Sequence, residues 1–328
     1  MSGGEPLRLG HIVFLQKHTV FAEQLGEVTA FLQQAFPGVR VTGAGRAEDL
    51  EPGLEADAVI APTLPWLSEA LERLRAVRWL HLLSSGVDPI WDMPFDKKDI
   101  VITRSSGVHA APLSEYALGA MLYFAKSFDR FVEQAREGHW QRAWLDELTG
   151  RRLMILGMGH IGAMLAQRAR VFGMRVVGVQ RNPRPVEGAE RCIGFDEVAD
   201  WLGETDYLVV CLPLTAATRN RVDAAFLAAL KPGAVLVDIS RGGIVVEPAL
   251  VDALASGRLR GAALDVFERE PLPRDSSLWR NPRVLLTPHV AGTTPYYMER
   301  ALEVFVANAR RLMRGETPVT PVDTGAGY

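Results

Sequence analysis

The sequence predicts an α/β protein with two domains, each built on a doubly wound parallel sheet. Its 328 residues are enough for about two domains of ordinary size. Short runs rich in Val, Ile and Leu alternate with stretches of helical periodicity along nearly the whole chain. Strands that alternate with helices form βαβ units, and such units give parallel sheets covered by helices on both faces.

Composition and charge exclude several classes of protein. Apolar residues make up 48% and charged residues 23%, as in a soluble globular protein. The net charge is −3 and no dense basic run occurs, so we expect no nucleic-acid partner and no membrane partner. Cys192 and Cys211 cannot build a disulfide framework and lack the spacing of metal ligands. The cysteine spacing leads us to expect no metal site. Because the start lacks a signal peptide and no apolar run reaches ~20 residues, we expect a cytoplasmic protein.

The first part of the chain contains expected strands at 11–16, 39–43, 57–62, 79–85 and 100–105, and expected helices at 20–36 and 65–74. Each strand is bounded by Gly, Pro or polar residues, and each helix carries apolar residues at helical spacing. One long helix follows, from Pro112 to about Gly138, and Tyr116 belongs to its broad apolar stripe.

A second alternating series begins at Gly150. The expected strands are 152–157, 175–180, 207–213, 234–240 and 261–267, with 284–289 as a sixth. The expected helices between them are 161–172, 196–202, 224–230 and 247–256, and one amphipathic helix covers 296–314. This order of elements is typical of the doubly wound fold that binds dinucleotides.

A glycine motif follows the first strand of this second series. Gly157, Gly159 and Gly162 form the pattern G-x-G-x-x-G, with His160 and Ile161 inside it. The first glycine permits a tight turn, the second lets the backbone approach a pyrophosphate, and the third lets the helix pack closely on the sheet. In a strand–turn–helix context the motif predicts a dinucleotide site, and a purely structural turn is the alternative.

The residues after the next strand bear on which dinucleotide binds. An NAD-selective fold places an Asp or Glu there, ~20 residues past the glycines, to bind the ribose hydroxyls. Here Gln180 and Arg181 stand at that point, and no carboxylate occurs before Glu187. Because the planar guanidinium of Arg181 can bind a 2′-phosphate, we favour NADP(H) as the cofactor, with NAD(H) as the alternative. The alternative is that Arg181 and Arg184 form a solvated basic loop.

Three further segments resemble one family. They are 238–243 (DISRGG), 264–273 (LDVFEREPLP) and 287–292 (TPHVAG). Together with the glycine motif and Leu212-Pro213-Leu214-Thr215, they are similar to the D-isomer-specific 2-hydroxyacid dehydrogenases over nearly the whole chain. The resemblance implies a discontinuous flavodoxin-like substrate domain, 1–106 with 294–328. It also implies an inserted Rossmann cofactor domain, 107–293, with the active site in the cleft between the two domains.

The chemistry of 2-keto acid reduction calls for the same residue types. A proton must reach the carbonyl oxygen, and histidine suits that task because its ordinary pKa lies near neutrality. An arginine can hold the substrate carboxylate and polarise the carbonyl oxygen. By resemblance His289 is the acid, Glu270 its partner and Arg241 the anchor. Glu268 competes with Glu270, and the family pattern selects Glu270 because it places the acid directly before a proline.

The resemblance implies reduction of small 2-keto acids to D-2-hydroxy acids, with glyoxylate and hydroxypyruvate as the first candidate substrates. The alternative is a nucleotide-sensing binding protein, like the family's transcriptional corepressors, because such sensors can keep the same three residues. A formate dehydrogenase of the same superfamily would have Gln in place of Glu270.

The resemblance also assigns residues around the reaction. Cofactor contacts are implied for Asp265 at the nicotinamide amide, for His289 and Gly292, and, along adenine and ribose, for Leu212, Pro213, Thr218 and Ile239. Substrate contacts are implied for Arg241, His289 and the backbone amides of a loop that contains Ser85 and Gly86.

Two tryptophans, Trp140 and Trp144, stand just before the first strand of the expected cofactor domain. In the resembled family this region belongs to a dimer contact, which implies a homodimer through the cofactor domains. Burial in the core of the same chain is the alternative.

Overall fold

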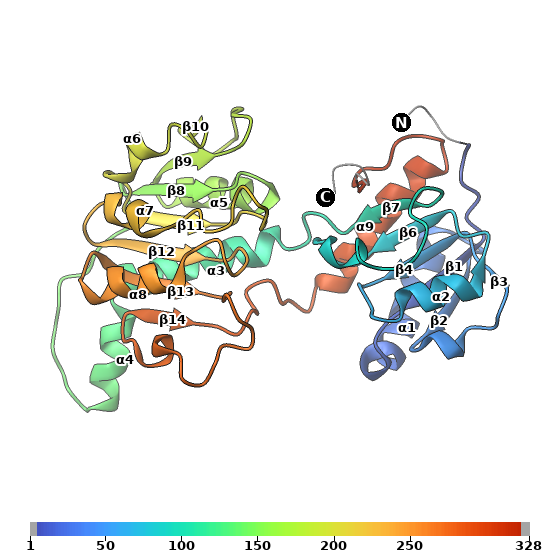
Figure 1. Cartoon of the computed structure of the whole chain (residues 1–328), viewed down its shortest axis with the longest axis horizontal. Helices are drawn as coiled ribbons and strands as arrows, with labels where there is room; N and C mark the ends of the chain where they lie inside the picture. The colour runs from blue at the N-terminus through green and yellow to red at the C-terminus, as the bar shows by residue number, and fades with distance from the viewer. Residues whose placement is uncertain (1–4, 323–328) are drawn as a thin grey trace. The chain divides into compact units, whose positions relative to one another are not determined.

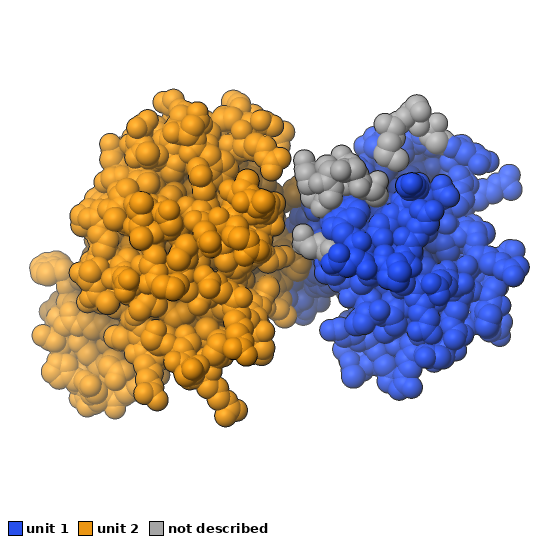
Figure 2. Space-filling model, in the orientation of Figure 1, with its two compact units in different colours: residues 1–108, 294–328 blue, residues 109–293 orange. Residues whose placement is uncertain are grey.

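The computed structural model describes residues 5–322, and the statements below concern those residues. The chain forms two compact units (Figures 1 and 2). Unit 1 consists of residues 1–108 and 294–328, and unit 2 of residues 109–293. The first and last parts of the chain therefore belong to the same unit.

Unit 1 is built on a five-stranded parallel sheet in the order β2-β1-β4-β6-β7. The strands are β1 (His11–Leu15), β2 (Arg40–Ala44), β4 (Ala58–Ala61), β6 (Trp79–Leu82) and β7 (Val101–Arg104). A separate two-stranded parallel sheet pairs β3 (Leu54–Glu55) with β5 (Leu74–Arg75). The main sheet has the flavodoxin-like order, which confirms the predicted fold class for this unit.

Helices cover both faces of this sheet. On one face α1 (His18–Ala35) and α9 (Tyr297–Leu312) bury an apolar cluster against β1, β4 and β6. On the other face lie α2 (Leu67–Arg73) and the single turn η1 (Ala47–Asp49), and a second short turn, η2 (Asp88–Ile90), precedes β7. The alternation of side chains along each strand supplies both clusters, because neighbouring residues point to opposite faces.

A polar cluster lies within the apolar core of unit 1. Trp79 is fully buried and stacks on Phe305 of α9, with 4.3 Å between ring centroids. His81 is also fully buried, with its Nδ1 2.7 Å from Oγ1 of Thr103 and its Nε2 3.0 Å from Oγ of Ser105. Burial lowers the pKa of His81 to about 3, so its imidazole is neutral at physiological pH and serves packing.

Unit 2 is built on a seven-stranded parallel sheet in the order β10-β9-β8-β11-β12-β13-β14. The strands are β8 (Arg152–Leu156), β9 (Arg175–Val179), β10 (Arg191–Ile193), β11 (Tyr207–Val210), β12 (Ala234–Asp238), β13 (Leu259–Leu264) and β14 (Val284–Leu286). Taken along the chain this is the Rossmann order 3-2-1-4-5-6 with one further strand. It confirms the predicted fold class, although β10 was not among the expected strands.

Two layers of helices enclose this sheet (Figure 1). On one face α3 (Ala110–Ala125) and α5 (His160–Val171) bury an apolar cluster. On the other face α6 (Ala199–Leu202), α7 (Ala224–Ala229) and α8 (Glu247–Ala255) bury a second one. A short turn, η3 (Ser277–Arg280), leads into β14.

The single helix expected from Pro112 to Gly138 is wrong, because the structure divides it into α3 and α4 (Phe128–Arg136). Ser127, between them, adopts the left-handed conformation (φ 50°). Its hydroxyl accepts a hydrogen bond from Nη2 of Arg260 at 3.1 Å, and the same guanidinium pairs with Asp129 at 3.3 Å. These contacts with β13 stabilise a break that the local sequence pattern does not reveal.

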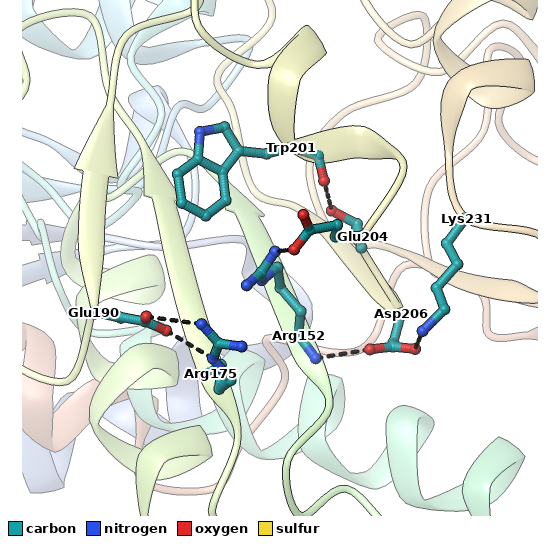
Figure 3. A network of polar contacts seen from close by, with 8 residues as sticks. Arg152, Arg175, Glu190, Trp201, Glu204, Asp206 and Lys231 are labelled. Carbon is teal, nitrogen blue, oxygen red and sulfur yellow. Dashed lines mark hydrogen bonds and ion pairs between the residues drawn. The ribbon is translucent and has the colours of Figure 1, made fainter.

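The amino-terminal edge of this sheet carries a network of charged side chains (Figure 3). Arg152 at the start of β8 is buried, pairs with Glu204 and lies 5.1 Å from the ring centroid of Trp201. Asp206 accepts hydrogen bonds from the backbone N–H of Arg152 at 2.8 Å and from Nζ of Lys231 at 2.7 Å. The charged groups drawn here are paired with one another, so they stabilise this edge, and the candidate site lies at the opposite, carboxyl edge.

Candidate active site

The glycine motif forms the turn between β8 and α5. Gly157 has φ +105°, and a side chain there would meet the carbonyl oxygen of Cys211 at 2.9 Å. A side chain at Gly162 would fall on the carbonyl oxygen of Gly157, so only glycine allows α5 to pack here. At Gly159, by contrast, no heavy atom other than those of adjoining residues in the chain lies within 4 Å of the position a side chain would take. The turn therefore leaves open space at the start of a helix, which fits a dinucleotide pyrophosphate.

The other predicted residues of this turn take different positions. His160 is the first residue of α5 and is exposed, whereas Ile161 is half-buried against the cluster of α3 and α5. The thiol of Cys211 donates a hydrogen bond to the carbonyl oxygen of Gly157 at 3.0 Å. Burial, with Asp238 nearby, raises the pKa of this thiol to about 12, so Cys211 supports the turn and is not a nucleophile.

Leu212 and Pro213 follow β11 at the same carboxyl edge. Leu212 is buried and Pro213 is exposed. The hydroxyl of Thr218 donates to the carbonyl oxygen of Pro213 at 2.6 Å and accepts from the backbone N–H of Thr215 at 2.8 Å. Thr218 thus closes the turn through its own hydrogen bonds, and Ile239, after β12, is buried.

Asp238, the last residue of β12, is a buried carboxyl that organises the loop carrying Arg241. It accepts hydrogen bonds from the backbone N–H of Ser240 at 3.0 Å and from the Ser240 hydroxyl. Arg241 is exposed, and its Nη1 donates to the carbonyl oxygen of Ser240 at 2.7 Å. Burial raises the pKa of Asp238 to about 7, opposed by the Ser240 hydrogen bonds and assisted by Asp265 and Glu247.

Replacing Asp238 with asparagine should stabilise the protein at high pH. A carboxyl whose pKa is raised from 3.8 to about 7 binds its proton more tightly in the folded state, so stability falls as the pH rises through that interval. Asparagine keeps an oxygen for Ser240 and carries no charge. We expect Asp238→Asn to raise the free energy of unfolding at pH 8 by a few kcal/mol and to change little at pH 4, measured by urea denaturation.

The exposed Asp252→Asn on α8 is the matched control, and it should leave stability unchanged at both pH values. If Asp238→Asn shifted stability equally at pH 4 and pH 8, the carboxyl would not titrate in this interval.

His289 and Glu270 meet at the same edge of the sheet. Nδ1 of His289 donates to Oε2 of Glu270 at 2.8 Å, and Oε1 of Glu270 accepts from the backbone N–H of Phe267 at 3.1 Å. The two side chains are 47% and 37% exposed, so the pair is accessible to a ligand. Because Nδ1 is engaged by the carboxylate, Nε2 is the ring nitrogen available to a ligand.

The competing carboxylate, Glu268, lies elsewhere. It accepts from the backbone N–H of Glu247 at 3.4 Å, and the backbone N–H of Glu268 donates to Glu247 at 2.5 Å. The structure therefore brings Glu270, and not Glu268, against His289.

Two further predicted cofactor residues flank the His289 loop. Asp265 is buried behind it, and its carboxylate accepts hydrogen bonds from the loop itself. The carbonyl oxygen of Gly292 accepts from Nδ1 of His109 at 3.2 Å, and a side chain at Gly292 would press on that ring. Burial, together with the nearby charge of Arg241, lowers the pKa of His109, so its neutral form predominates.

The predicted substrate loop belongs to unit 1, at the carboxyl end of β6. The Ser85 hydroxyl donates to the carbonyl oxygen of Ser105 at 2.6 Å, and the Ser84 hydroxyl donates to that of Gly86 at 2.7 Å. Nη1 of Arg104 donates to the carbonyl oxygen of Ser85 at 3.2 Å. The Ser84 proton is thus used inside the loop and the Ser85 proton on the segment after β7, which leaves backbone N–H groups as the donors that the loop can offer an anion.

In the described part of the chain, no group of three or more His, Cys, Asp or Glu side chains could hold a metal ion. None of the helices within residues 5–322 is both long enough and apolar enough to cross a membrane.

A Rossmann sheet with an open glycine turn and an accessible histidine–carboxylate pair at its carboxyl edge defines a dinucleotide-binding oxidoreductase. The family model described as "D-isomer specific 2-hydroxyacid dehydrogenase, NAD binding domain" matches residues 118–291. The chain belongs to this family of 2-hydroxyacid dehydrogenases.

The relatives include glyoxylate/hydroxypyruvate reductases and D-3-phosphoglycerate dehydrogenases. The chain is 34% identical over 306 residues to a glyoxylate/hydroxypyruvate reductase A of Salmonella paratyphi C, covering 90% of this chain and 94% of that one. It is 28% identical over 298 residues to a D-3-phosphoglycerate dehydrogenase of Methanocaldococcus jannaschii, covering 90% of this chain but only 55% of that longer protein. Among solved structures, an NADPH-dependent glyoxylate/hydroxypyruvate reductase of Sinorhizobium meliloti, in complex with NADP and sulfate, has a TM-score of 0.81. The two sequences are 29% identical, and the match covers 98% of this chain and 100% of the Sinorhizobium protein.

Proposed function

We propose that this protein reduces small 2-keto acids, such as glyoxylate or hydroxypyruvate, to D-2-hydroxy acids with NADPH. The observation that carries the proposal is the 2.8 Å contact between His289 and Glu270, at the sheet edge where the glycine turn opens. The names of the relatives support this choice of substrate and cofactor, since two are glyoxylate/hydroxypyruvate reductases and one of these is NADPH-dependent.

The residues have distinct roles in this reaction. Bound NADPH supplies the hydride for the carbonyl carbon. Glu270 holds the imidazole of His289 through Nδ1, so that Nε2 delivers a proton to the carbonyl oxygen. Arg241 uses one guanidinium nitrogen on its own loop and keeps the others for the substrate carboxylate and carbonyl oxygen.

The cofactor and substrate contacts follow from the same proposal. The pyrophosphate lies on the turn formed by Gly157, Gly159, His160, Ile161 and Gly162. Leu212, Pro213, Thr218 and Ile239 line the adenine and ribose, and Asp265 and Gly292 lie nearer the nicotinamide. In unit 1, Ser85 and Gly86 offer backbone amides to the substrate carboxylate.

A substrate panel tests the proposal. NADPH and NADH oxidation is followed spectrophotometrically with glyoxylate, hydroxypyruvate, pyruvate and 3-phosphohydroxypyruvate. We expect the highest kcat/KM with one of the first two acids and NADPH. Turnover confined to 3-phosphohydroxypyruvate would reassign the substrate, and the absence of turnover with every acid would refute the reductase.

Reversing the charge of Arg181 should change the choice of cofactor. Arg181 is exposed directly after β9, where the side chain of Gln180 donates to the carbonyl oxygen of Arg184 at 2.7 Å and so braces the loop. A carboxylate would repel a 2′-phosphate and accept hydrogen bonds from a 2′-hydroxyl. We expect Arg181→Asp to weaken NADPH binding at least tenfold more than NADH binding, measured as the two Kd values by fluorescence titration.

Arg170→Asp, an equal charge change at an exposed position of α5, is the control and should affect both cofactors alike. Equal losses of NADPH and NADH affinity in Arg181→Asp would show that this residue does not contact the 2′-phosphate.

A homodimer through unit 2 accounts for the most exposed aromatic side chains. Trp140 and Trp144 are 94% and 101% exposed, and Phe128 and Val132 of α4 are also exposed nearby in the chain. Such an apolar surface is typical of a protein interface. We expect the double variant Trp140→Ser, Trp144→Ser to shift the protein toward monomer in light scattering. Trp279→Ser, which is 53% exposed on η3, is the control. A wild-type protein that is monomeric at high concentration would refute this interface.

A further inference from the structure

The loop that carries His289 is held by one buried carboxylate. Asp265, directly after β13, is only 2% exposed. Its Oδ1 accepts hydrogen bonds from the backbone N–H of Val290 at 2.9 Å and from the hydroxyl of Thr287 at 2.6 Å. Its Oδ2 accepts from the backbone N–H of Ala291 at 3.0 Å. All three donors therefore lie on the loop, on both sides of His289.

A second hydroxyl extends this arrangement to another element. The Tyr116 hydroxyl, on α3, lies 2.7 Å from Oγ1 of Thr287. The single hydroxyl proton of Thr287 goes to Asp265, because a carboxylate only accepts, so Tyr116 must be the donor to Thr287. Burial raises the pKa of Tyr116, which keeps this donor protonated at physiological pH. The order of donation is thus fixed as Tyr116 to Thr287 to Asp265.

The loop needs such support because its backbone is unfavourable. His289 has φ +55°, a left-handed conformation that is unfavourable for a residue other than glycine. Pro288, His289 and Val290 are all exposed, so apolar packing does little to hold them. Backbone hydrogen bonds such as that from Thr287 N–H to the carbonyl oxygen of Leu264 hold the ends of the loop. The hydrogen bonds to Asp265 are the side-chain contacts on both sides of His289 that support the conformation in which its imidazole meets Glu270.

We propose that Tyr116 and Thr287 are positioning residues for His289 and act through Asp265. The hydrogen bonds of both side chains lead to Asp265 and not to His289. Without the Thr287 hydroxyl, Asp265 loses one of three hydrogen bonds in a buried site, and the loop exchanges among other conformations. The contact of His289 with Glu270 is then populated for less of the time. A lower rate of keto acid reduction is expected only if the proposed reductase function holds. The greater mobility of the His289 loop is expected whether or not it holds.

Four variants test the proposal by activity. Thr287→Val keeps the shape and removes the hydroxyl, Thr287→Ser keeps the hydroxyl, and Tyr116→Phe removes the first donor. Tyr123→Phe, on the same helix but packed on Phe124 and Phe128, is the matched control. A misplaced proton donor lowers the rate of the chemical step rather than binding. We expect Thr287→Val to lower kcat about 10- to 100-fold with KM and the NADPH Kd within about threefold.

The remaining variants separate positioning from general stability. Thr287→Ser should restore kcat to within about threefold of the wild type, Tyr116→Phe should lower it less than Thr287→Val, and Tyr123→Phe should leave it unchanged. A Thr287→Val enzyme with normal kcat would overturn the proposal. So would a Thr287→Ser enzyme as impaired as Thr287→Val, because the hydroxyl would then not be the group that matters.

Hydrogen exchange provides a readout that needs no substrate. Amide exchange of residues 287–292, followed by mass spectrometry, should be faster in Thr287→Val and Tyr116→Phe than in the wild type and Tyr123→Phe. Exchange at wild-type rates in both variants would overturn the proposal. If the wild type reduced no keto acid, the proposed function would fail, and the exchange result alone would decide whether Tyr116 and Thr287 position the loop.

Discussion

Replacing His289 with alanine should lower kcat for keto acid reduction by about 10²- to 10⁴-fold, the range for loss of a positioned general acid. The geometry around His289 is the reason for this expectation. Nδ1 of His289 is bound to Glu270 and the ring is accessible at the carboxyl edge of the sheet, so the proposed reaction assigns the transferred proton to Nε2. Cofactor affinity should stay within a few-fold, because the glycine turn is formed by β8 and α5 without His289.

Steady-state kinetics and NADPH fluorescence titration measure the two quantities separately. His18→Ala, an exposed histidine of α1, is the control and should keep full activity. Glu270→Gln should retain the geometry but lose the carboxylate, and we expect an intermediate kcat. A His289→Ala enzyme with near-normal turnover would refute the role of this residue as proton donor.

The sequence was sufficient to predict where the candidate site lies, because parallel strands end at one edge. Gly157, Arg241 and Asp265 each follow a strand of unit 2, and the structure places them at that edge. The choice of Glu270 over Glu268 rested on a family pattern, and the structure agrees in the contact with His289. Their chemical roles stay predictions.

The support of the His289 loop could not be predicted in the same way. Tyr116 fits the apolar stripe of a helix, and nothing in that periodicity indicates that its hydroxyl meets Thr287, 171 residues further along. Thr287 precedes a proline and looks like an ordinary loop residue. A hydrogen bond between distant segments depends on the tertiary fold, so only the structure reveals it.

The shortest strands could not be predicted from the sequence, for a different physical reason. Strands β3 and β5 have two residues each and β10 has three, too few for a period of two to be visible.

The break between α3 and α4 depends on Arg260 of β13, which binds Ser127 from outside the helix. Each of these features is set by partners in space rather than by local propensity.

Replacing Arg241 with glutamine should lower kcat/KM for keto acids by about 10³-fold, of the order of 4 kcal/mol. Arg241 is exposed on the loop after β12, and that loop is held by Asp238 through Ser240. Its guanidinium can bind a carboxylate with two parallel hydrogen bonds and also polarise the carbonyl oxygen. Glutamine is neutral and has a single pair of donors, so both interactions weaken.

Arg241→Lys separates charge from geometry. Lysine restores the positive charge, but as a point charge without the planar guanidinium. We therefore expect a kcat/KM between that of the glutamine variant and that of the wild type. Relative to the wild type, KM should be raised more than kcat is lowered. Arg280→Gln, an exposed arginine of η3, is the control for the loss of one positive charge. An Arg241→Gln enzyme with an unchanged KM for glyoxylate would assign the substrate carboxylate to another group, and the backbone amides around Ser85 would then be the next to test.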